Sequence, residues 1–395
     1  MKKEFLDLGK QPITNSFLNK GEFDGEFLFN LRAVFDDETK LVSLKEFVSP
    51  EMMFNDVYAH RASESYTMRE SFKKLANDLQ KEYMPTSVLE IGSNDGVFIR
   101  HFNPDNTFAV EPCSNLAELT NDMGYKTYSE FWDTTLAKKL KQNHGYFDLI
   151  YSANTISHIE DLDEVFQAVK MSLSDDGIFI MEDPSLFNVM KNVSYDIFYD
   201  EHVHVFSVTA LNNILTRNGL QIFRVDNLSV HGGSNRIYIK LSDNKYQEIE
   251  TSVSENLDKE KSFGIDNFNT YLDFSERVKK SKSDLVSILN DFKKQGKKII
   301  SYGATYKSAT IFNYCKIGTN LIDYVTDTTE NKQGKYTPGM HIPIVSPEDG
   351  FDDTVDVAYL GAWNFEKEIC EKESEFLKRG GKFVTHVPNV RVVEL

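Results

Sequence analysis

The chain has 395 residues, of which 40% are apolar and 12% aromatic, and it carries a formal net charge of −17 at neutral pH. This length and composition predict two or three domains with apolar cores of their own and exclude a disordered chain. The negative charge, together with the lack of any Lys/Arg-rich stripe, excludes nucleic acid as a favoured partner.

The sequence contains no signal for export, membrane insertion or metal binding. Its first residues, MKKEFLDLGKQP, reach charged and polar positions before an apolar segment can develop, and no stretch approaches the roughly 20 apolar residues of a membrane span. The three cysteines, Cys113, Cys315 and Cys370, lie too far apart for a CxxC knuckle or a disulfide framework. We therefore expect a cytoplasmic monomer or homodimer with no metal and no membrane partner.

Four parts follow one another along the chain: a small N-terminal module at 1–69, a central α/β domain at 70–245, a helical connector at 246–296 and a second α/β domain at 297–395. The strands expected in the central domain are SVLEIG, FAVEP, FDLIYSA and GIFIMED, followed by QIFRVDNL and NRIYIKLS around an HGGS turn. The connector carries Phe268, Leu272, Val278, Leu285 and Leu289 at helical intervals. In the last part the expected strands are KKIISYGA, IDYVTD, VDVAYLGA and KFVTHV, with helices between them. The central domain is predicted to form a parallel sheet and the last part a second α/β domain.

A glycine turn follows the first strand of the central domain, in the run from Val88 to Gly96. Gly92 and Gly96 would let the backbone approach a ligand closely at the carboxyl edge of the sheet, where open α/β sheets bind. The spacing Glu90-x-Gly92-x-x-x-Gly96 is neither the G-x-G-x-x-G of dinucleotide folds nor the Gly-Lys-Ser/Thr of P-loops. A nicotinamide dehydrogenase is therefore disfavoured.

Two further polar positions follow the next strands. Glu111 ends FAVEP, about 20 residues after the glycine turn, where an acid can accept hydrogen bonds from ribose hydroxyls. Asn154 and His158 follow FDLIYSA, where the other side of a bound nucleoside should lie, although His158 could equally be a satisfied histidine packed below it.

Together these elements resemble the class I S-adenosylmethionine methyltransferases over about residues 70–185. The resemblance implies a Rossmann-like parallel sheet and S-adenosylmethionine as cofactor. The cofactor-binding residues it implies are Glu90, Gly92, Asn94, Asp95, Gly96, Glu111, Asn154 and His158.

The stretch YDIFYDEHVHVFS, from Tyr195 to Ser207, resembles the EHxxxFS-type signature of the antibiotic-type nucleotide-sugar C-methyltransferases. The segments FLDLGKQPITNSFL, HGGSNRIY, YGATYKSATIFNYC, KQGKYTPGMHIPIVSP and LGAWNF extend this resemblance over nearly the whole chain. It implies carbon methylation of a nucleotide-linked 4-keto-deoxysugar through an enolate made by a base.

The same resemblance assigns roles to residues near this signature. His202 is the expected base, because imidazole titrates near neutrality, with His204 as a less favoured substitute. Glu201 would orient or charge His202, and Tyr199 would donate a hydrogen bond. Tyr58 matches an N-terminal tyrosine of the family, and Tyr66 is its alternative.

The substrate diphosphate requires local positive charge in so acidic a chain. Arg236, in the HGGSN turn with His231 and Ser234, and Lys307, after the turn that begins at Tyr302, are the expected substrate-binding residues. Lys332 and Lys335 are interpreted as loop charges.

The N-terminal module departs from the family, whose members carry paired CxxC zinc knuckles there, because this segment has no cysteine. We expect a metal-free module whose core contains Phe27, Leu28, Leu41, Val42 and Phe47. Two alternatives to C-methylation stay open: methylation of a sugar oxygen or nitrogen, and a non-catalytic protein that binds nucleotide sugars.

Overall fold

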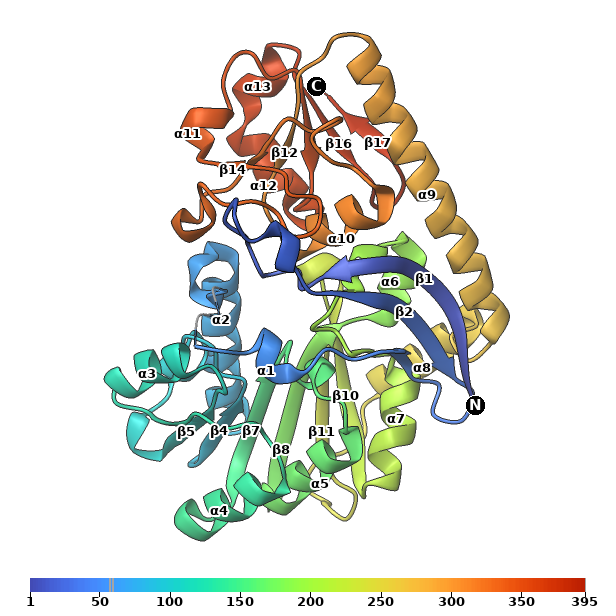
Figure 1. Ribbon diagram of the computed structural model, residues 1–395. Coiled ribbons are helices and arrows are strands. Elements are labelled where there is room, and N and C mark those ends of the chain that lie inside the picture. Colours follow the sequence, from blue (N-terminus) through green and yellow to red (C-terminus); the bar gives the residue numbers. More distant parts are fainter. Residues whose placement is uncertain (57, 59, 395) are drawn as a thin grey trace.

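Three β-sheets organise the protein, as the computed structural model shows (Figure 1). The structure describes residues 1–56, 58 and 60–394, without the side chain of His231. A seven-stranded central sheet lies at one end, a six-stranded C-terminal sheet at the other, and a four-stranded N-terminal sheet between them.

The central sheet has the order β10-β11-β8-β7-β4-β5-β6. Its strands are β4 (Val88–Ile91), β5 (Thr107–Val110), β6 (Lys126–Tyr128), β7 (Phe147–Ala153), β8 (Leu173–Pro184), β10 (Leu220–Leu228) and β11 (Ser234–Leu241). The first five run parallel, whereas β11 is antiparallel to both β8 and β10. Every strand expected from the sequence in this sheet is present, which confirms the α/β class.

Helices cover both faces of this sheet, which explains why β4 and β5 are buried along their whole length. They are α2 (Tyr66–Glu82), α3 (Ser114–Asp122), α4 (Thr134–His144), α5 (Leu162–Ser172) and α7 (Val208–Arg217). The helix α6 (Leu186–Asn192) instead packs into the core that the N-terminal strands share with the C-terminal part. Local sequence sets where several begin: Asp133 and Asp161 accept hydrogen bonds from the first turns of α4 and α5, as N-caps do.

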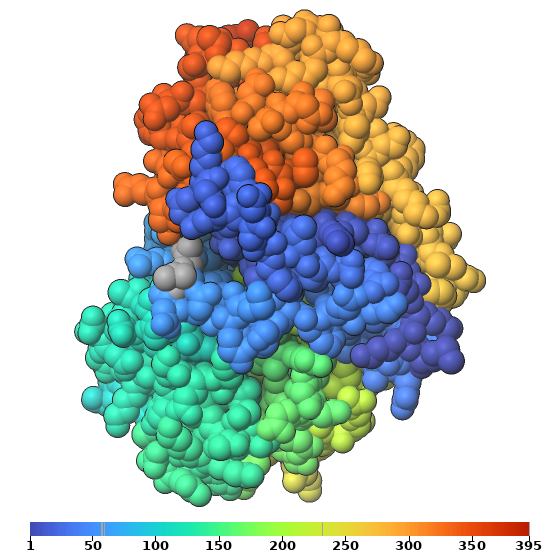
Figure 2. All heavy atoms as spheres, viewed as in Figure 1, coloured from blue at the N-terminus to red at the C-terminus, as the bar shows by residue number. Residues whose placement is uncertain are grey.

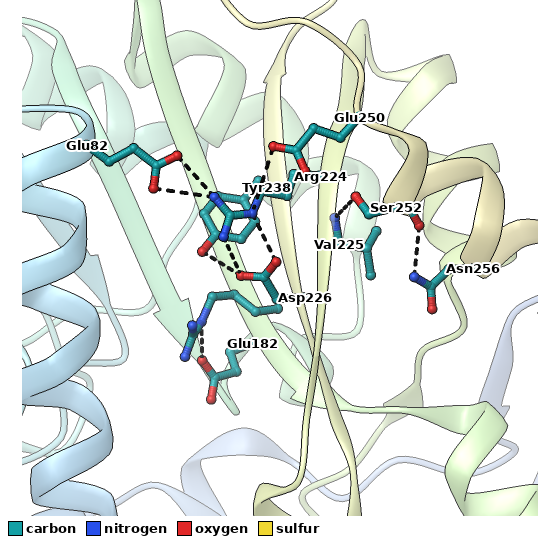
Figure 3. A network of polar contacts seen from close by, with 10 residues as sticks. Glu82, Glu182, Arg224, Val225, Asp226, Tyr238, Glu250, Ser252 and Asn256 are labelled. Atoms are coloured by element: carbon teal, nitrogen blue, oxygen red, sulfur yellow. Dashed lines mark hydrogen bonds and ion pairs between the residues drawn. The ribbon is translucent and has the colours of Figure 1, made fainter.

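An ionic network closes the antiparallel edge of the central sheet (Figure 3). Arg224 on β10 pairs with Glu82 of α2 at 3.0 Å and with Asp226 at 2.9 Å, and its guanidinium lies over the ring of Tyr238. The hydroxyl of Ser252, on α8 (Thr251–Phe263), accepts a hydrogen bond from the β10 backbone. The network thus ties both helices to the strand pair that ends the sheet.

The C-terminal sheet has the order β14-β13-β12-β15-β16-β17. Its strands are β12 (Ile299–Tyr302), β13 (Val325–Thr326), β14 (Ile344–Val345), β15 (Val357–Leu360), β16 (Lys382–Thr385) and β17 (Arg391–Val393), and its helices are α10 (Tyr306–Cys315), α11 (Pro347–Gly350), α12 (Glu366–Lys372) and α13 (Ser374–Lys378). All strands but β17 are parallel, and this part has the α/β character expected from the sequence.

The long helix α9 (Phe268–Lys294) runs along the N-terminal strands to the C-terminal sheet (Figure 1). Its Val278, Leu285 and Leu289 are buried, as the helical spacing predicted. Leu272 is 44% exposed, so its predicted place on the inner face was wrong; Tyr271 takes that position and packs on Phe5.

The N-terminal sheet joins the start of the chain to the middle of the central part. It contains β1 (Lys2–Pro12), β2 (Leu28–Asp36), β3 (Val42–Leu44) and β9 (His204–Val205), with α1 (Pro50–Met53) following β3. Phe27 and Leu28 are exposed, which corrects their expected place in the core; Phe5, Leu31 and Phe35 fill it instead. Because β9 pairs with β3, this sheet holds the chain directly after His202.

Candidate active site

A cavity of about 610 Å³ lies where the three sheets meet. Its walls come from the N-terminal, central and C-terminal parts of the chain: Asn15 and Phe17 from the N-terminal module, Gly92, Glu111, Asn154, His158, Glu201 and His202 from the central part, and Tyr306, Lys307 and Lys332 from the C-terminal part. N-terminal residues lie between the other two parts on the face shown in Figure 2. The size suits a cofactor and part of a substrate.

Residue 92 has to be glycine in this fold. Its φ is +74°, and an added Cβ would lie 2.1 Å from the hydroxyl oxygen of Thr155. Gly92 lines the cavity at the end of β4. Gly96 also has a positive φ, but it faces Thr120 rather than the cavity, so its role is to pack the turn.

Two carboxyl groups face the cavity at the ends of β4 and β5. Glu111 accepts hydrogen bonds from the backbone N–H groups of Asn94 at 2.8 Å and Cys113 at 2.9 Å, one on each oxygen. Each oxygen has a further lone pair for a ligand hydroxyl. Glu90 is buried, which raises its pKa well above the usual range, and its Oε2 has no hydrogen-bond partner among the described residues.

Asn94 and Asp95 hold a segment of chain over the cavity. The Asn94 side chain accepts a hydrogen bond from the N–H of Ala62 at 2.9 Å and donates one to the carbonyl of His60 at 3.2 Å. Asp95 accepts from the N–H of Ser63 at 3.3 Å and does not line the cavity. Asp95 therefore positions this segment, whereas Asn94 both positions it and lines the cavity.

Two histidine rings stack in the cavity. The centroids of His158 and His202 are 5.3 Å apart, and burial, with a contribution from His60, lowers the pKa of His158 to about 3. The Nδ1 atom of His202 lies 2.9 Å from the carbonyl oxygen of Ile197. A carbonyl only accepts, so Nδ1 carries the hydrogen and Nε2 of neutral His202 carries the lone pair.

The other predicted catalytic residues surround His202. Tyr58 donates a hydrogen bond to Glu201 at 3.2 Å, and the ring of Tyr199 lies 4.3 Å from that of His202 and stacks on Tyr306 at 4.4 Å. Burial, followed by the charge of Asp200, raises the pKa of Glu201 to about 8. All four predicted catalytic side chains thus line one cavity.

The two residues held as alternatives lie elsewhere. Tyr66 is 68% exposed and is not part of the cavity wall. His204 is buried, with one ring nitrogen 2.9 Å from the Ser43 hydroxyl and the other 3.1 Å from the Glu160 carbonyl, so both nitrogens have structural partners.

The predicted substrate-binding residues are not brought together. Lys307 lines the cavity, whereas Ser234, Arg236 and Tyr302 do not. Arg236 pairs with buried Glu182 at 2.9 Å, and Tyr302 donates to Glu373 at 2.7 Å. Ser234 is buried, with its hydroxyl donating to the Val230 carbonyl at 3.3 Å, and the side chain of His231 lies outside the described residues.

The charge of Lys307 is enclosed. Its Nζ has no hydrogen-bond partner among the residues that the structure describes, and it lies 4.4 Å from the centre of the Trp363 ring. Burial lowers its pKa, and the charge of Asp196 opposes that effect. A buried ammonium without such a partner is costly unless a ligand supplies one.

Sequence reasoning missed several residues at this site. Lys332 was interpreted as a loop charge, but it lines the cavity and donates to the Ala304 carbonyl at 3.0 Å. Asn15 and Phe17 also line it. They belong to the segment ITNSFL, whose resemblance to the family was the only available signal.

Metal and membrane features were also searched. Within the described ranges, no group of three or more His, Cys, Asp or Glu side chains could hold a metal ion. None of the helices in the same ranges combines the length and apolar character needed to cross a bilayer.

The fold and this cavity define a class I S-adenosylmethionine-dependent methyltransferase: residues 58–225 match the family model described as a methyltransferase domain. Residues 229–388 match a C-methyltransferase C-terminal domain, and residues 1–54 match a putative zinc binding domain although they contain no cysteine. The C-methyltransferase NovU of Streptomyces niveus is 31% identical over 397 residues, which cover 99% of this chain and 94% of NovU. The chain therefore belongs to this C-methyltransferase family.

Solved structures are similar over a smaller part of the chain. A methyltransferase from Clostridium acetobutylicum has 18% identity and a TM-score of 0.35, covering 44% of this chain and 92% of its own. Magnesium protoporphyrin IX methyltransferase from Synechocystis has 13% identity and a TM-score of 0.34, covering 44% and 87%.

The residues at the ends of β4 and β5 suit S-adenosylmethionine, the cofactor of this class. The Gly92 turn leaves a space that a side chain would close, and Glu90 presents an unpartnered buried oxygen, again within the described part of the chain. Glu111 lies at the end of β5 with one backbone hydrogen bond on each oxygen, and its role toward ribose hydroxyls stays a prediction.

Replacing Glu111 by glutamine should weaken binding of S-adenosylhomocysteine about 10- to 100-fold, because the amide nitrogen cannot accept a hydrogen bond and faces a backbone donor. Calorimetry with the purified variants measures this. Glu118→Gln changes an exposed carboxylate on α3 and should bind like the parent protein. Equal affinity of the Glu111 and Glu118 variants would contradict the assignment.

Proposed function

We propose that the protein methylates a carbon atom next to the ketone of a nucleotide-linked 4-keto-deoxysugar. The observation that carries this proposal is the orientation of His202: its Nδ1–H is held by the Ile197 carbonyl, so Nε2 carries the lone pair, and the residue lines the same cavity as Gly92 and Glu111. Transfer to oxygen or nitrogen has less need of such a base.

Cofactor binding is proposed for the wall formed by Glu90, Gly92, Asn94, Glu111 and Asn154. When bound, S-adenosylmethionine supplies an electrophilic methyl group on a sulfonium. His158 stacks between Phe54 and His202 and stays uncharged because burial lowers its pKa to about 3. A charged His158 would repel the imidazolium form of His202 and so weaken His202 as a base. Because His158 is uncharged, this repulsion does not arise.

His202 is the proposed base of the reaction. Its Nε2 removes the proton from the carbon beside the ketone, and the electron pair of that C–H bond moves into the enolate, whose carbon is then methylated. The imidazolium afterwards returns its proton to solvent. A histidine held by a backbone carbonyl keeps the tautomer that this step requires.

Donors for the enolate oxygen come from the pair of Tyr58 and Glu201. The pKa of Glu201 is raised to about 8, so near neutral pH its carboxyl group carries a proton, as does the hydroxyl of Tyr58. The hydrogen bond between the two side chains uses only one of these protons. The second proton can be donated to an oxygen in the cavity, and Tyr199 offers another hydroxyl.

The diphosphate is proposed to lie near Lys307 and Lys332, which line the C-terminal side of the cavity. We do not include Arg236 and Tyr302, which the sequence suggested as substrate-binding residues, because each is paired with a carboxylate outside the cavity. A local pair of ammonium groups opposes the repulsion that the net charge of −17 exerts on an anionic substrate.

The test is incubation of the protein with S-adenosylmethionine and a panel of nucleotide-linked 4-keto-deoxysugars. Mass spectrometry should detect the gain of one methylene unit, and NMR should place the new methyl group on carbon. No product with any sugar would overturn the substrate class, whereas a methyl group on oxygen or nitrogen would overturn the enolate step.

Replacing Lys307 by methionine should raise KM for the nucleotide sugar about 10- to 100-fold, because a hydrogen bond to a charged group contributes about 1.5–3 kcal/mol. The same change should raise Tm, since it removes a buried ammonium that has no hydrogen-bond partner among the described residues. Lys316→Met, at the exposed end of α10, is the control and should change neither value. An unchanged KM with Lys307→Met would remove this residue from the substrate site.

A further inference from the structure

The segment 13–27 joins β1 to β2 and is called the N-terminal loop here. One end of it contacts the candidate catalytic segment. Thr14 donates to one carboxylate oxygen of Asp200 through its backbone N–H at 3.0 Å and its hydroxyl at 2.7 Å. Asn15 donates through its side-chain amide to Oε1 of Glu201 at 2.7 Å and lines the cavity.

The other end of the loop contacts the C-terminal part of the chain. Leu18 and Tyr336 exchange two backbone hydrogen bonds, of 3.1 and 2.9 Å. Glu26 accepts the N–H of Gly339 at 2.7 Å on one oxygen, and its other oxygen lies 2.8 Å from Nε2 of His341. Phe23 stacks on the His341 ring with a centroid distance of 4.0 Å.

These contacts explain how the module keeps its place without a metal. The loop lies within the range that matches a putative zinc binding domain, yet it contains no cysteine. The carboxylate of Glu26 is only 9% exposed, so its hydrogen bonds are shielded from water and are worth more than surface contacts. Glu26, Phe23 and His341 therefore form a clasp between the loop and the C-terminal part.

We propose that Asn15 is a positioning residue for Glu201, and that the clasp of Glu26, Phe23 and His341 holds the N-terminal loop against the active site in place of a metal. The role of Glu201 in the reaction rests on the proposed function, whereas the contacts of the loop do not. The N-terminal module accordingly forms one wall of the active site and positions Glu201.

The hydrogen bond from Asn15 acts on the ionisation of Glu201. An amide donor favours the charged carboxylate, so its loss raises the pKa of Glu201 further above about 8. The titratable groups that face Glu201 are Asp200 and His202 from its own segment and Tyr58, Cys113, Tyr199 and Tyr306 from the elements packed around it. None of these is altered by a change at residue 15.

The first experiment compares Asn15→Leu with Asn15→Gln. NMR of protein carrying ¹³C-carboxyl glutamate follows Glu201, whose signal is identified with Glu201→Gln. Asn15→Leu should raise the pKa of Glu201 by about one unit. It should also lower kcat about 10-fold with little change in KM, because the carboxyl group loses the amide that holds its Oε1 in place, and Asn15→Gln should restore part of both effects. An unchanged titration, or a glutamine variant no better than leucine, would overturn the role of Asn15.

The second experiment compares Glu26→Ala with Glu22→Ala. Glu22 is on the same loop, and its carboxylate accepts hydrogen bonds from the backbone and side chain of nearby Asn19 rather than from the C-terminal part. Hydrogen exchange of the Leu18 and Gly339 amides should be at least about 10-fold faster in Glu26→Ala and unchanged in Glu22→Ala, with or without a metal chelator. Unchanged exchange in Glu26→Ala, or faster exchange caused by the chelator alone, would overturn the clasp.

The titration of Glu201 and the exchange of the loop amides are both measured without substrate. If no nucleotide sugar is methylated, the proposed function fails while the titration of Glu201 and the exchange of the loop still decide this inference. If methylation is observed but neither the pKa of Glu201 nor the exchange rate of the loop amides changes, the roles of Asn15 and the clasp are wrong while the proposed function stands.

Discussion

Replacement of His202 by alanine is expected to lower kcat by about 10²- to 10⁴-fold and to leave the affinity for S-adenosylhomocysteine within about twofold of the parent protein. The imidazole is the proposed acceptor of the proton, with Nδ1–H held by the Ile197 carbonyl, and alanine provides neither a base nor a donor. Product formation with an active keto-sugar and calorimetry with the demethylated cofactor measure the two quantities.

Isotope exchange separates proton removal from methyl transfer. In heavy water the parent protein, with S-adenosylhomocysteine bound, should exchange the proton beside the ketone, and His202→Ala should not. His204→Asn is the matched control: this buried histidine contacts Ser43 and the Glu160 carbonyl, so the variant should lose stability yet retain exchange. Persistent exchange in His202→Ala would assign the base to another group.

Replacement of Gly92 by alanine is expected to weaken S-adenosylhomocysteine binding at least about 100-fold and to lower Tm. Two costs add here. A side chain at φ +74° costs roughly 1–2 kcal/mol, and the new Cβ would lie 2.1 Å from the Thr155 hydroxyl oxygen, so the turn must move. Calorimetry and thermal unfolding measure both consequences.

Gly296→Ala distinguishes these two costs. Gly296 follows α9, has the same φ of +74°, and has nothing within 4 Å of its added Cβ. It should therefore lose stability through backbone strain alone and bind the demethylated cofactor normally. If Gly92→Ala also bound it normally, the cofactor would not lie against this turn.

The strands of the two α/β sheets could be predicted because their signal is local. VAYL is apolar throughout and VLEI is apolar except for Glu90, and both strands are buried along their whole length. The N-terminal strands had no comparable signal: β1 alternates charged and apolar residues with two register shifts, and it was not predicted. Of the core residues expected for this module, Val42 is buried, whereas Phe27 and Leu28 are exposed.

The substrate side of the site was harder to predict for an electrostatic reason. A sequence shows which residues are cationic but does not show where their partners lie. Arg236 is opposite Glu182 on the neighbouring strand, so its charge is already satisfied, while Lys332 reaches the cavity from a loop. Only the packing of distant segments decides which charge faces a ligand.

The sequence by itself determined the class of the protein. The glycine turn at Gly92, the acid Glu111 and the EH pair at Glu201 and His202 are each encoded in a few adjacent residues, because a turn or a strand end needs no distant partner to place them. The tertiary structure alone decided that Asn15 contacts Glu201 and that Lys307 lies buried against Trp363. These pairs are separated by many residues, and only the burial of the apolar cores brings them within contact distance.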